Sequence, residues 1–193
     1  MGTVVLVILL YSFLETGGQD NYVQEILDKR AETDQFMRNS KESPFLNKLE
    51  SYHGLNYFEP DLEFKINADF TKISDGKIRK LPTSDGKEEQ YQEYGFADFN
   101  LDRRNHRLLI LKTVEGESNH IFIPFADSTS GDETYGAGRY LELPTIKGGK
   151  VLLDFNLAYN PYCAYSADYS CPLPPAENYL ATSIKAGEKN YDK

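Results

Sequence analysis

The hydrophobic pattern of this 193-residue chain changes its period once, close to Glu63. Beyond that point apolar residues alternate with polar ones, as is typical of a strand with one buried face: Phe64, Ile66, Ala68 and Phe70. Further strand patterns follow, separated by turn sequences, at residues 77–83, 91–101, 107–114, 119–125, 140–143, 150–155 and 179–185. About eight short strands without helices between them predict a mainly β fold, an antiparallel sandwich or barrel.

Two helices are predicted before the sheet. In residues 20–39 apolar side chains recur every three or four positions, which indicates an amphipathic helix. In residues 44–53, Pro44 follows the capping residue Ser43, and Gly54 stands where a helix would end. We therefore expect the helices 20–39 and 44–53 to pack outside the sheet.

The chain begins with an apolar segment that bears on its location. Residues 3–14 are uncharged, but they are fewer than the ~20 residues that a membrane-spanning helix needs. Small residues at 16–18 are typical of a signal-peptidase site. We expect residues 1–18 to be a signal peptide or membrane anchor of an extracytoplasmic protein, and 19–193 to form a single domain. The alternative is a buried N-terminal helix or strand.

The charge balance excludes several classes of function. Lys and Arg total 21 against 30 Asp and Glu, so the net charge of -9 would repel a nucleic-acid backbone or an anionic bilayer. We expect no nucleic-acid partner, and membrane contact only through the N-terminal segment. Three His and two Cys exclude zinc-finger arrays, four-Cys iron–sulfur proteins and disulfide-dense scaffolds. We expect no metal and no cofactor.

The loop 127–139 is the densest polar segment. Its glycines would let backbone N–H groups approach an anion, and Arg139 offers a planar fork suited to a carboxylate or phosphate. It contains no P-loop lysine, and its acidic residues lack EF-hand spacing. Two interpretations of Arg139 stay open. It contacts a ligand, or it pairs with a structural carboxylate, with Asp154 the first candidate and Glu188 the second.

A proline-rich arm, residues 158–177, follows the last long strand pattern and is too rich in proline for a central strand. Asp154 and Asn156 stand where this strand ends, so they either floor a pocket or satisfy backbone groups of the arm. Because the loop 127–139 and the segment 156–178 both leave strand ends, we expect them to meet and Arg139 to be at least partly buried.

Cys163 and Cys171 enclose seven residues of this arm. In an exported protein they would form a disulfide, with their Cα atoms within roughly 7 Å. Two further interpretations are unpaired buried thiols, and a catalytic or metal-binding pair. No histidine lies near them in the sequence to act as a base.

Two stretches of the sequence carry a resemblance to a known family. The runs PFADSTSGDETYGAGRYLELP and LDFNLAYNPYCAYSADYSCPLPPAENYLATSIKAGEK resemble the signature of a prokaryotic family known only as a domain of unknown function. With the less distinctive SPFLNKLESYHGLNYFEPDLEFKINADF, the likeness covers about residues 22–191. The resemblance implies no activity. It points to these matching positions: Asp127, Thr129, Gly131, Thr134, Tyr135, Arg139, Asp154, Asn156, Cys163, Cys171, Pro172, Asn178, Gly187 and Glu188.

Three functions are compatible with these residues. The first is a module that binds a small polar or anionic ligand through Asp127, Tyr135, Arg139, Asn156 and Asn178. The second is a hydrolase with its site in the loops 127–139 and 154–178, in which Asp154 or Glu188 is the general base. The third is a structural or interaction domain, in which the same polar residues only hold the arm in place.

Overall fold

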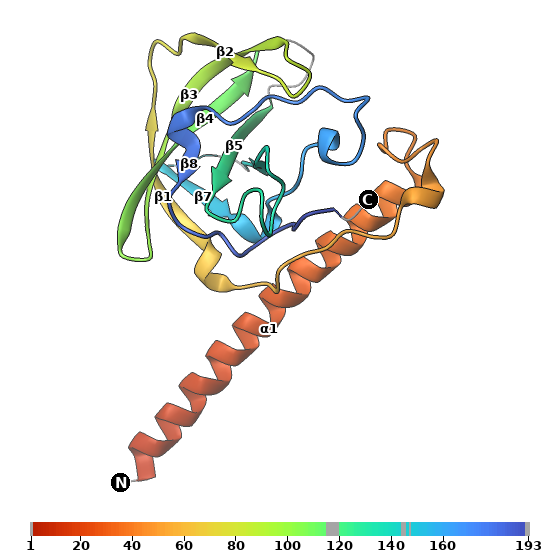
Figure 1. The fold of residues 1–193 in the computed structure, drawn as a ribbon. Coiled ribbons are helices and arrows are strands. Elements are labelled where there is room, and N and C mark those ends of the chain that lie inside the picture. The colour runs from red at the N-terminus through yellow and green to blue at the C-terminus, as the bar shows by residue number, and fades with distance from the viewer. Residues whose placement is uncertain (1, 115–119, 144–145, 147, 192–193) are drawn as a thin grey trace.

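The computed structural model describes residues 2–114, 120–143, 146 and 148–191, with side chains from residue 18 onward. One α-helix, α1 (Gly2–Asn39), precedes the strands (Figure 1). The strands of the described residues are β1 (Lys65–Lys72), β2 (Ile78–Pro82), β3 (Glu88–Leu101), β4 (Arg104–Thr113), β5 (Ile121–Asp127), β6 (Arg139–Glu142), β7 (Lys150–Asp154) and β8 (Tyr179–Leu180). Short 3-10 helices are η1 (Leu49–Ser51), η2 (Leu62–Phe64), η3 (Phe155–Leu157), η4 (Tyr162–Ala164) and η5 (Ala176–Asn178).

The strands form one curled, half-barrel sheet, which confirms the expected mainly antiparallel β fold. Its order is β6-β5-β4-β3-β1-β7, and β2 adds to β3. The short β8 pairs with β5 in parallel, whereas the other pairs are antiparallel. Strand β3 is the longest and pairs with β1, β2 and β4, so it holds the two halves of the sheet together.

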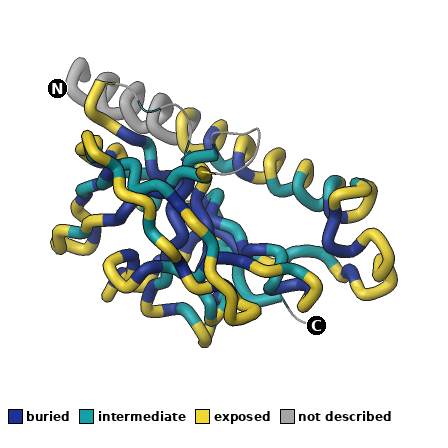
Figure 2. The backbone as a smooth tube through the Cα atoms, turned by 90° about the horizontal axis from the view of Figure 1, so that it is seen from above, coloured by how far each residue is buried: buried dark blue, intermediate teal, exposed yellow. Residues whose placement is uncertain are grey.

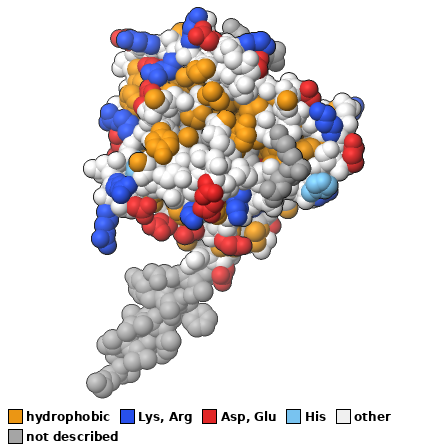
Figure 3. All heavy atoms as spheres, in the orientation of Figure 1, with side chains coloured by type: hydrophobic (Ala, Val, Ile, Leu, Met, Phe, Trp, Pro, Cys, Tyr) orange, Lys and Arg blue, Asp and Glu red, His pale blue; other side chains and the backbone are white. Residues whose placement is uncertain are grey.

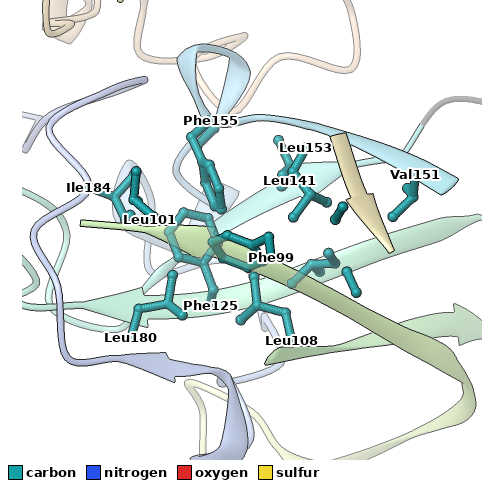
Figure 4. Close-up of a cluster of buried hydrophobic side chains, with 14 of the residues drawn as sticks. Phe99, Leu101, Leu108, Phe125, Leu141, Val151, Leu153, Phe155, Leu180 and Ile184 are labelled. Atoms are coloured by element: carbon teal, nitrogen blue, oxygen red, sulfur yellow. The ribbon is translucent and has the colours of Figure 1, made fainter. Parts of the chain in front are cut away.

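Strand β4 is buried on both faces, which explains its unbroken run of apolar residues, 108–111. Because successive side chains point to opposite faces, Leu108 and Ile110 enter the main core, and Leu109 and Leu111 enter a second cluster. Figure 4 shows the main core, in which aromatic and aliphatic side chains from β3, β4, β5 and β7 meet. The second cluster includes Tyr140 of β6 and Cys171 of the arm.

The proline-rich arm is an ordered crossing segment, as expected. Helix η3 directly precedes the arm, η4 lies within it and η5 ends it, and the arm crosses the curled sheet (Figure 1). Figure 3, in the same orientation, shows hydrophobic side chains gathered on the visible face and charged side chains mostly toward its rim. Cys171 and the partly buried Tyr159, Cys163 and Tyr169 of the arm pack into the second cluster, so the arm covers this cluster.

The helix expected at 20–39 is confirmed as the C-terminal part of α1, but a second helix at 44–53 was wrong. Only η1 is helical in that range. Phe45 instead packs between Tyr52, Tyr165 and Tyr191, with ring centroids 4.8–5.5 Å apart. An isolated helix of about ten residues is marginal in water, so this aromatic packing overrides the local helical pattern.

Helix α1 lies along the sheet and is exposed over most of its described surface (Figure 2). Tyr22, Ile26 and Met37 are its buried residues. The predicted signal or anchor segment, 1–18, falls at the start of α1, where the side chains of 2–17 are outside the described residues. Within the described part of the chain, no helix combines the length and apolarity of a membrane span.

Candidate functional site

Arg139 is completely buried, and the chain itself bonds its two terminal nitrogens, whereas its Nε has no hydrogen-bond partner among the described residues. Its Nη2 donates to Asp127 Oδ2 at 2.9 Å and to the carbonyl oxygen of Ile184 at 2.9 Å. Its Nη1 donates to the carbonyl oxygens of Ala186 at 2.5 Å and Glu188 at 3.1 Å. We call this group the Arg139 lock. It ties the start of β6 to the end of β5 and to the C-terminal segment.

The expected burial of Arg139 is confirmed, but both predicted partners of its guanidinium were wrong. Asp154 does not contact it, and Glu188 contributes its backbone carbonyl rather than its carboxylate. The pairing carboxylate is Asp127, because β5 and β6 pair with Phe125 opposite Arg139. The sequence held a signal for this pair, because the loop 127–139 joins two consecutive strand patterns. When such strands pair in antiparallel fashion, the two ends of the loop lie side by side.

The loop 127–139 satisfies its own polar groups. Asp127 Oδ1 accepts from the backbone N–H and hydroxyl of Thr129, at 2.8 and 2.6 Å, and from the backbone N–H of Ile184 at 3.2 Å. The Thr129 and Thr134 hydroxyls lie 2.9 Å apart. Asp127 and Arg139 therefore act as structural residues in this geometry, and the loop offers no open anion cradle around them.

Asn178 also has a structural position. Its side chain accepts from the backbone N–H of Leu109 at 2.6 Å and donates to the carbonyl oxygens of Leu109 and Pro124, at 2.9 and 2.8 Å. It is fully buried. Asn178 therefore bridges β4 and β5 from the end of the arm, and none of these contacts leaves it free for a ligand.

Asp154 and Asn156 anchor helix α1 and the segment before β1. Asp154 Oδ1 accepts from the Tyr22 hydroxyl at 2.8 Å, and Asn156 Nδ2 donates to that hydroxyl oxygen at 2.8 Å. Asn156 also accepts from the backbone N–H of Asp61 at 2.8 Å and donates to its carbonyl oxygen at 2.7 Å. Of these two predicted site residues, Asn156 borders a pocket.

Glu188 is buried beside the same pocket. Its carboxylate accepts from the Tyr165 hydroxyl at 2.6 Å, from the Asn160 backbone N–H at 2.9 Å and from Asn160 Nδ2 at 2.8 Å. Burial raises the pKa of Glu188 to about 7, although these hydrogen bonds act to lower it. Glu188 can therefore change its protonation state near neutral pH.

The pocket lies between the C-terminal half of α1 and the arm. Its volume is about 730 Å³, and its lining is largely apolar and aromatic. We call it the α1 pocket. The aromatic residues Phe36, Tyr57 and Tyr165 and the amide of Asn156 line it, and its charged lining residues are Lys29, Arg30, Glu32, Glu142 and Glu188. Concave, mostly apolar pockets with a few polar groups are typical of small-molecule sites.

Arg30 is the unsatisfied residue of this pocket. Its guanidinium carbon lies 4.4 Å from the centre of the Tyr57 ring, a cation–π contact. Its Nε and Nη2 atoms are buried and have no hydrogen-bond partner among the described residues. Burial lowers the pKa of Arg30. A buried N–H group without a partner costs about 1–3 kcal/mol, so this arrangement calls for an explanation.

Two other arginines show what this edge of a guanidinium usually does. Arg38 donates through Nε and Nη2 to the two carboxylate oxygens of Asp34, at 2.8 and 3.3 Å. Arg107 does the same to Asp98, at 2.6 and 3.1 Å. This two-point geometry matches a carboxylate. Arg30 has the same pair of donors beside a pocket, without a carboxylate of the described chain on them.

The sequence analysis missed Arg30, although a signal was present. Arg30 follows Ile26 by four positions and precedes Met37 by seven, so it falls on the buried stripe of the helix. A charged residue on that stripe indicates either a buried partner or a ligand. Tyr57 had no comparable signal, because it comes from an irregular segment.

The two cysteines lie side by side within the arm. The Cys163 backbone N–H donates to Cys171 Sγ at 3.2 Å, and the Tyr135 hydroxyl donates to Cys163 Sγ at 3.8 Å. Both cysteines are free thiols, so the predicted disulfide is not formed in this structure. The contact of Tyr135 with Cys163, together with the backbone pairing of Tyr140 with Tyr159, confirms that the loop 127–139 meets the arm.

In the described part of the chain, no three His, Cys, Asp or Glu residues are grouped so that they could hold a metal ion. A comparison with curated proteins finds no match.

Two other comparisons place the chain. It resembles the solution NMR structure of the uncharacterized protein from gene locus rrnAC0354 of Haloarcula marismortui, with 35% sequence identity and a TM-score of 0.69. That match covers 90% of this chain and 96% of the other. The model of the family described as "Protein of unknown function (DUF1684)" matches residues 50–189. The fold, the NMR structure and the family model agree, and the chain belongs to the DUF1684 family.

Proposed function

We propose that this protein binds a small organic anion, a carboxylate with an apolar or aromatic body, in the α1 pocket. The observation that carries the proposal is the unpaired Nε and Nη2 edge of Arg30 at the pocket wall. The aromatic lining would take up the apolar body, and Arg30 would take up the carboxylate. The proposal requires the Arg30 side chain to turn this edge toward the pocket as the ligand enters.

This proposal keeps the ligand class expected from the sequence and moves the site. Both terminal nitrogens of Arg139 and the side chains of Asp127 and Asn178 are bonded by the chain itself, whereas the Nε and Nη2 atoms of Arg30 are not. We also keep as a proposal that the protein is exported or membrane-tethered through residues 1–18, on the strength of the apolar run at 3–14. Sequencing the N-terminus of the protein recovered from cell fractions would test it, and an intact Met1 in a cytoplasmic fraction would contradict it.

Hydrolysis remains the second candidate because Glu188 borders the pocket with a pKa raised by burial to about 7. That pKa suits a general acid or base at neutral pH. Both of its carboxylate oxygens, however, already accept hydrogen bonds from Tyr165 and Asn160. These contacts leave little room for a substrate water and favour binding over catalysis.

Calorimetric titration with 3-phenylpropanoate, and with 3-phenylpropanamide as a neutral analogue of the same shape, would test the binding proposal. We expect the carboxylate to bind and the amide to bind about 10–100-fold more weakly, because a hydrogen bond to a charged group contributes about 1.5–3 kcal/mol. Arg30→Met should remove this preference. Arg38→Met is the matched control, since Arg38 lies on the same helix and is paired with Asp34.

Three results would contradict the proposal. Equal affinity for the carboxylate and the amide would remove the role of charge. Unchanged binding by Arg30→Met would show that Arg30 does not contact the ligand. An equal loss of the preference for the carboxylate in Arg38→Met would show that the overall charge of the helix causes it.

A further inference from the structure

The cysteine pair has an unequal arrangement that the ligand proposal does not use. Cys163 belongs to η4 and is partly exposed, whereas Cys171 is 7% exposed and lies in the second hydrophobic cluster. The Cys163 backbone N–H points at Cys171 Sγ, 3.2 Å away. One thiol is therefore within reach of a small reagent, and the other lies directly behind it.

Both ends of the pair are held by the surrounding chain. The Cys171 backbone N–H donates to Ser84 Oγ at 3.2 Å, and the Ser84 backbone N–H donates to the Cys171 carbonyl oxygen at 2.9 Å. On the other side, the Ala164 backbone N–H donates to the Pro161 carbonyl oxygen at 2.8 Å, within the turn that carries Cys163. The sulfur atoms are therefore kept as neighbours while both are reduced.

Hydroxyl and thiol donors surround the sulfur of Cys163. The Tyr135 hydroxyl donates to it at 3.8 Å. A hydrogen bond from the Cys171 thiol is the largest influence that lowers the pKa of Cys163 to about 6, and hydrogen bonds from Ser84 and Tyr135 add to it. The same hydrogen bond to Cys163, together with burial, raises the pKa of Cys171. These donors favour the thiolate at Cys163 and the thiol at Cys171.

We propose that Cys163 and Cys171 form a reversible dithiol–disulfide site that exchanges with small-molecule disulfides, with Cys163 as the attacking sulfur and Cys171 as the resolving one. The arrangement fits this division of roles, because the attacking thiolate is the accessible sulfur and the resolving thiol is protected behind it.

The exchange balances in two steps. In the first, the Cys163 thiolate attacks one sulfur of a small disulfide RSSR, the S–S bond breaks, a thiolate RS⁻ leaves, and Cys163 carries a mixed disulfide. In the second, Cys171 gives its proton to the released thiolate and attacks Cys163 Sγ, and the second RS⁻ leaves. The protein dithiol loses two electrons, RSSR gains them, and the products are the internal disulfide, RSH and RS⁻.

Intact-mass spectrometry of the full, reduced chain incubated with glutathione disulfide would test the proposal. For the wild type we expect the loss of two hydrogen atoms without a stable adduct, reversed by dithiothreitol. Cys171→Ser should stop at one glutathione adduct on Cys163, because the resolving sulfur is gone. Cys163→Ser should stay largely unmodified, because Cys171 is buried.

Several results would overturn it. These are a wild-type chain that keeps two free thiols, an internal disulfide that dithiothreitol cannot reduce, and faster modification of Cys163→Ser than of Cys171→Ser. If a serine variant does not fold, the wild type still decides the roles by alkylation and peptide mapping. The alkylation rate of Cys163 should level off above a midpoint of about pH 6. A profile that keeps rising to pH 8.5, as an ordinary thiol would give, overturns the assignment.

A positioning role for Tyr135 has its own readout. Tyr135→Phe removes one hydrogen bond to Cys163 Sγ and should move the alkylation midpoint to higher pH without blocking disulfide formation. Tyr169→Phe is the control, because Tyr169 packs against the same hydrophobic cluster as the two cysteines and its hydroxyl has no contact with Cys163 among those the structure describes. Equal alkylation midpoints in the two variants would show that the Tyr135 hydroxyl does not affect the pKa of Cys163.

Discussion

The Arg139 lock and the α1 pocket each contain a buried arginine beside aromatic side chains, yet their hydrogen bonding differs. Arg139 lies 5.3 Å from the Phe125 ring centre and donates to one carboxylate and three backbone carbonyls. Arg30 lies 4.4 Å from the Tyr57 ring centre, and two of its buried nitrogen atoms have no partner in the described chain. In Arg139 the two terminal nitrogens make four hydrogen bonds and Nε alone has no partner in the described chain, whereas in Arg30 both donors of the Nε–Nη2 edge have none. The bonded guanidinium of Arg139 therefore stabilises the fold, and the two-donor edge of Arg30 marks a candidate site.

The largest expected effect is the loss of the lock in Arg139→Ala. This change removes the donor to Asp127 Oδ2 and to three carbonyl oxygens, and it removes the charge that faces the buried Asp127 carboxylate. We expect it to cost about 3–5 kcal/mol in the free energy of unfolding, measured by urea denaturation, or to prevent folding. Arg107→Ala, which breaks an exposed pair with Asp98, is the control and should have a far smaller effect. A stable Arg139→Ala protein would contradict the structural role of Arg139, which is the difference proposed between the lock and the α1 pocket.

The variant Asn178→Ala tests whether a buried polar side chain outside the lock, bonded by the chain itself, also stabilises the fold. Asn178→Ala leaves the Leu109 N–H, the Leu109 carbonyl and the Pro124 carbonyl without their side-chain partner. We expect a loss of about 2–4 kcal/mol in the free energy of unfolding, because buried unpaired groups cost about 1–3 kcal/mol each and some can find other partners. Asn100→Ala, at an exposed pair with Asn105, is the control. Equal stabilities of the two variants would contradict this stabilising role.

Glu188 links the two regions, since its carbonyl belongs to the lock and its carboxylate borders the pocket. Burial raises the pKa of this carboxyl from 4.5 to about 7 in the folded protein. Between these pH values the carboxyl group has lost its proton in the unfolded chain and keeps it in the folded protein. The contribution of Glu188 to the free energy of unfolding is therefore largest below pH 4.5 and is lost as the pH rises from 4.5 to about 7.

The expected loss between pH 4.5 and 7.5 is a few kcal/mol, measured as the difference between wild type and Glu188→Gln. The glutamine cannot ionise, so its own pH dependence serves as the baseline for all other groups. Parallel curves for the two proteins would contradict the raised pKa of Glu188.

The smallest effect on stability is expected for Arg30→Met. Methionine keeps an apolar stem against Tyr57. Removal of the two unpaired N–H groups stabilises the fold, whereas loss of the cation–π contact destabilises it, so the two effects oppose each other. We expect a change in the free energy of unfolding within about 1 kcal/mol in either direction, by urea denaturation. A loss of stability as large as that of Arg139→Ala would show that Arg30 also stabilises the fold. The two arginines would then not differ in role.

Much of the fold follows from local pattern. Alternating side chains predicted β1, and the doubly buried run at 108–111 became the central strand β4. The burial of Arg139 and the meeting of the loop 127–139 with the arm were also predicted, because both segments leave strand ends. The predicted helix at 44–53 was wrong, because the conformation of that segment depends on packing against the remote rings of Tyr165 and Tyr191.

The sequence by itself determined the strands, the arm and the family, because side-chain alternation, proline and contiguous motifs are local properties. Only the tertiary structure decided which polar residues are satisfied. Arg30, Tyr57 and Glu188 meet at one pocket from distant parts of the chain, and no spacing encodes their meeting. Whether a buried group has a hydrogen-bond partner depends on packing between segments far apart in the sequence, and that packing separates the Arg139 lock from the α1 pocket.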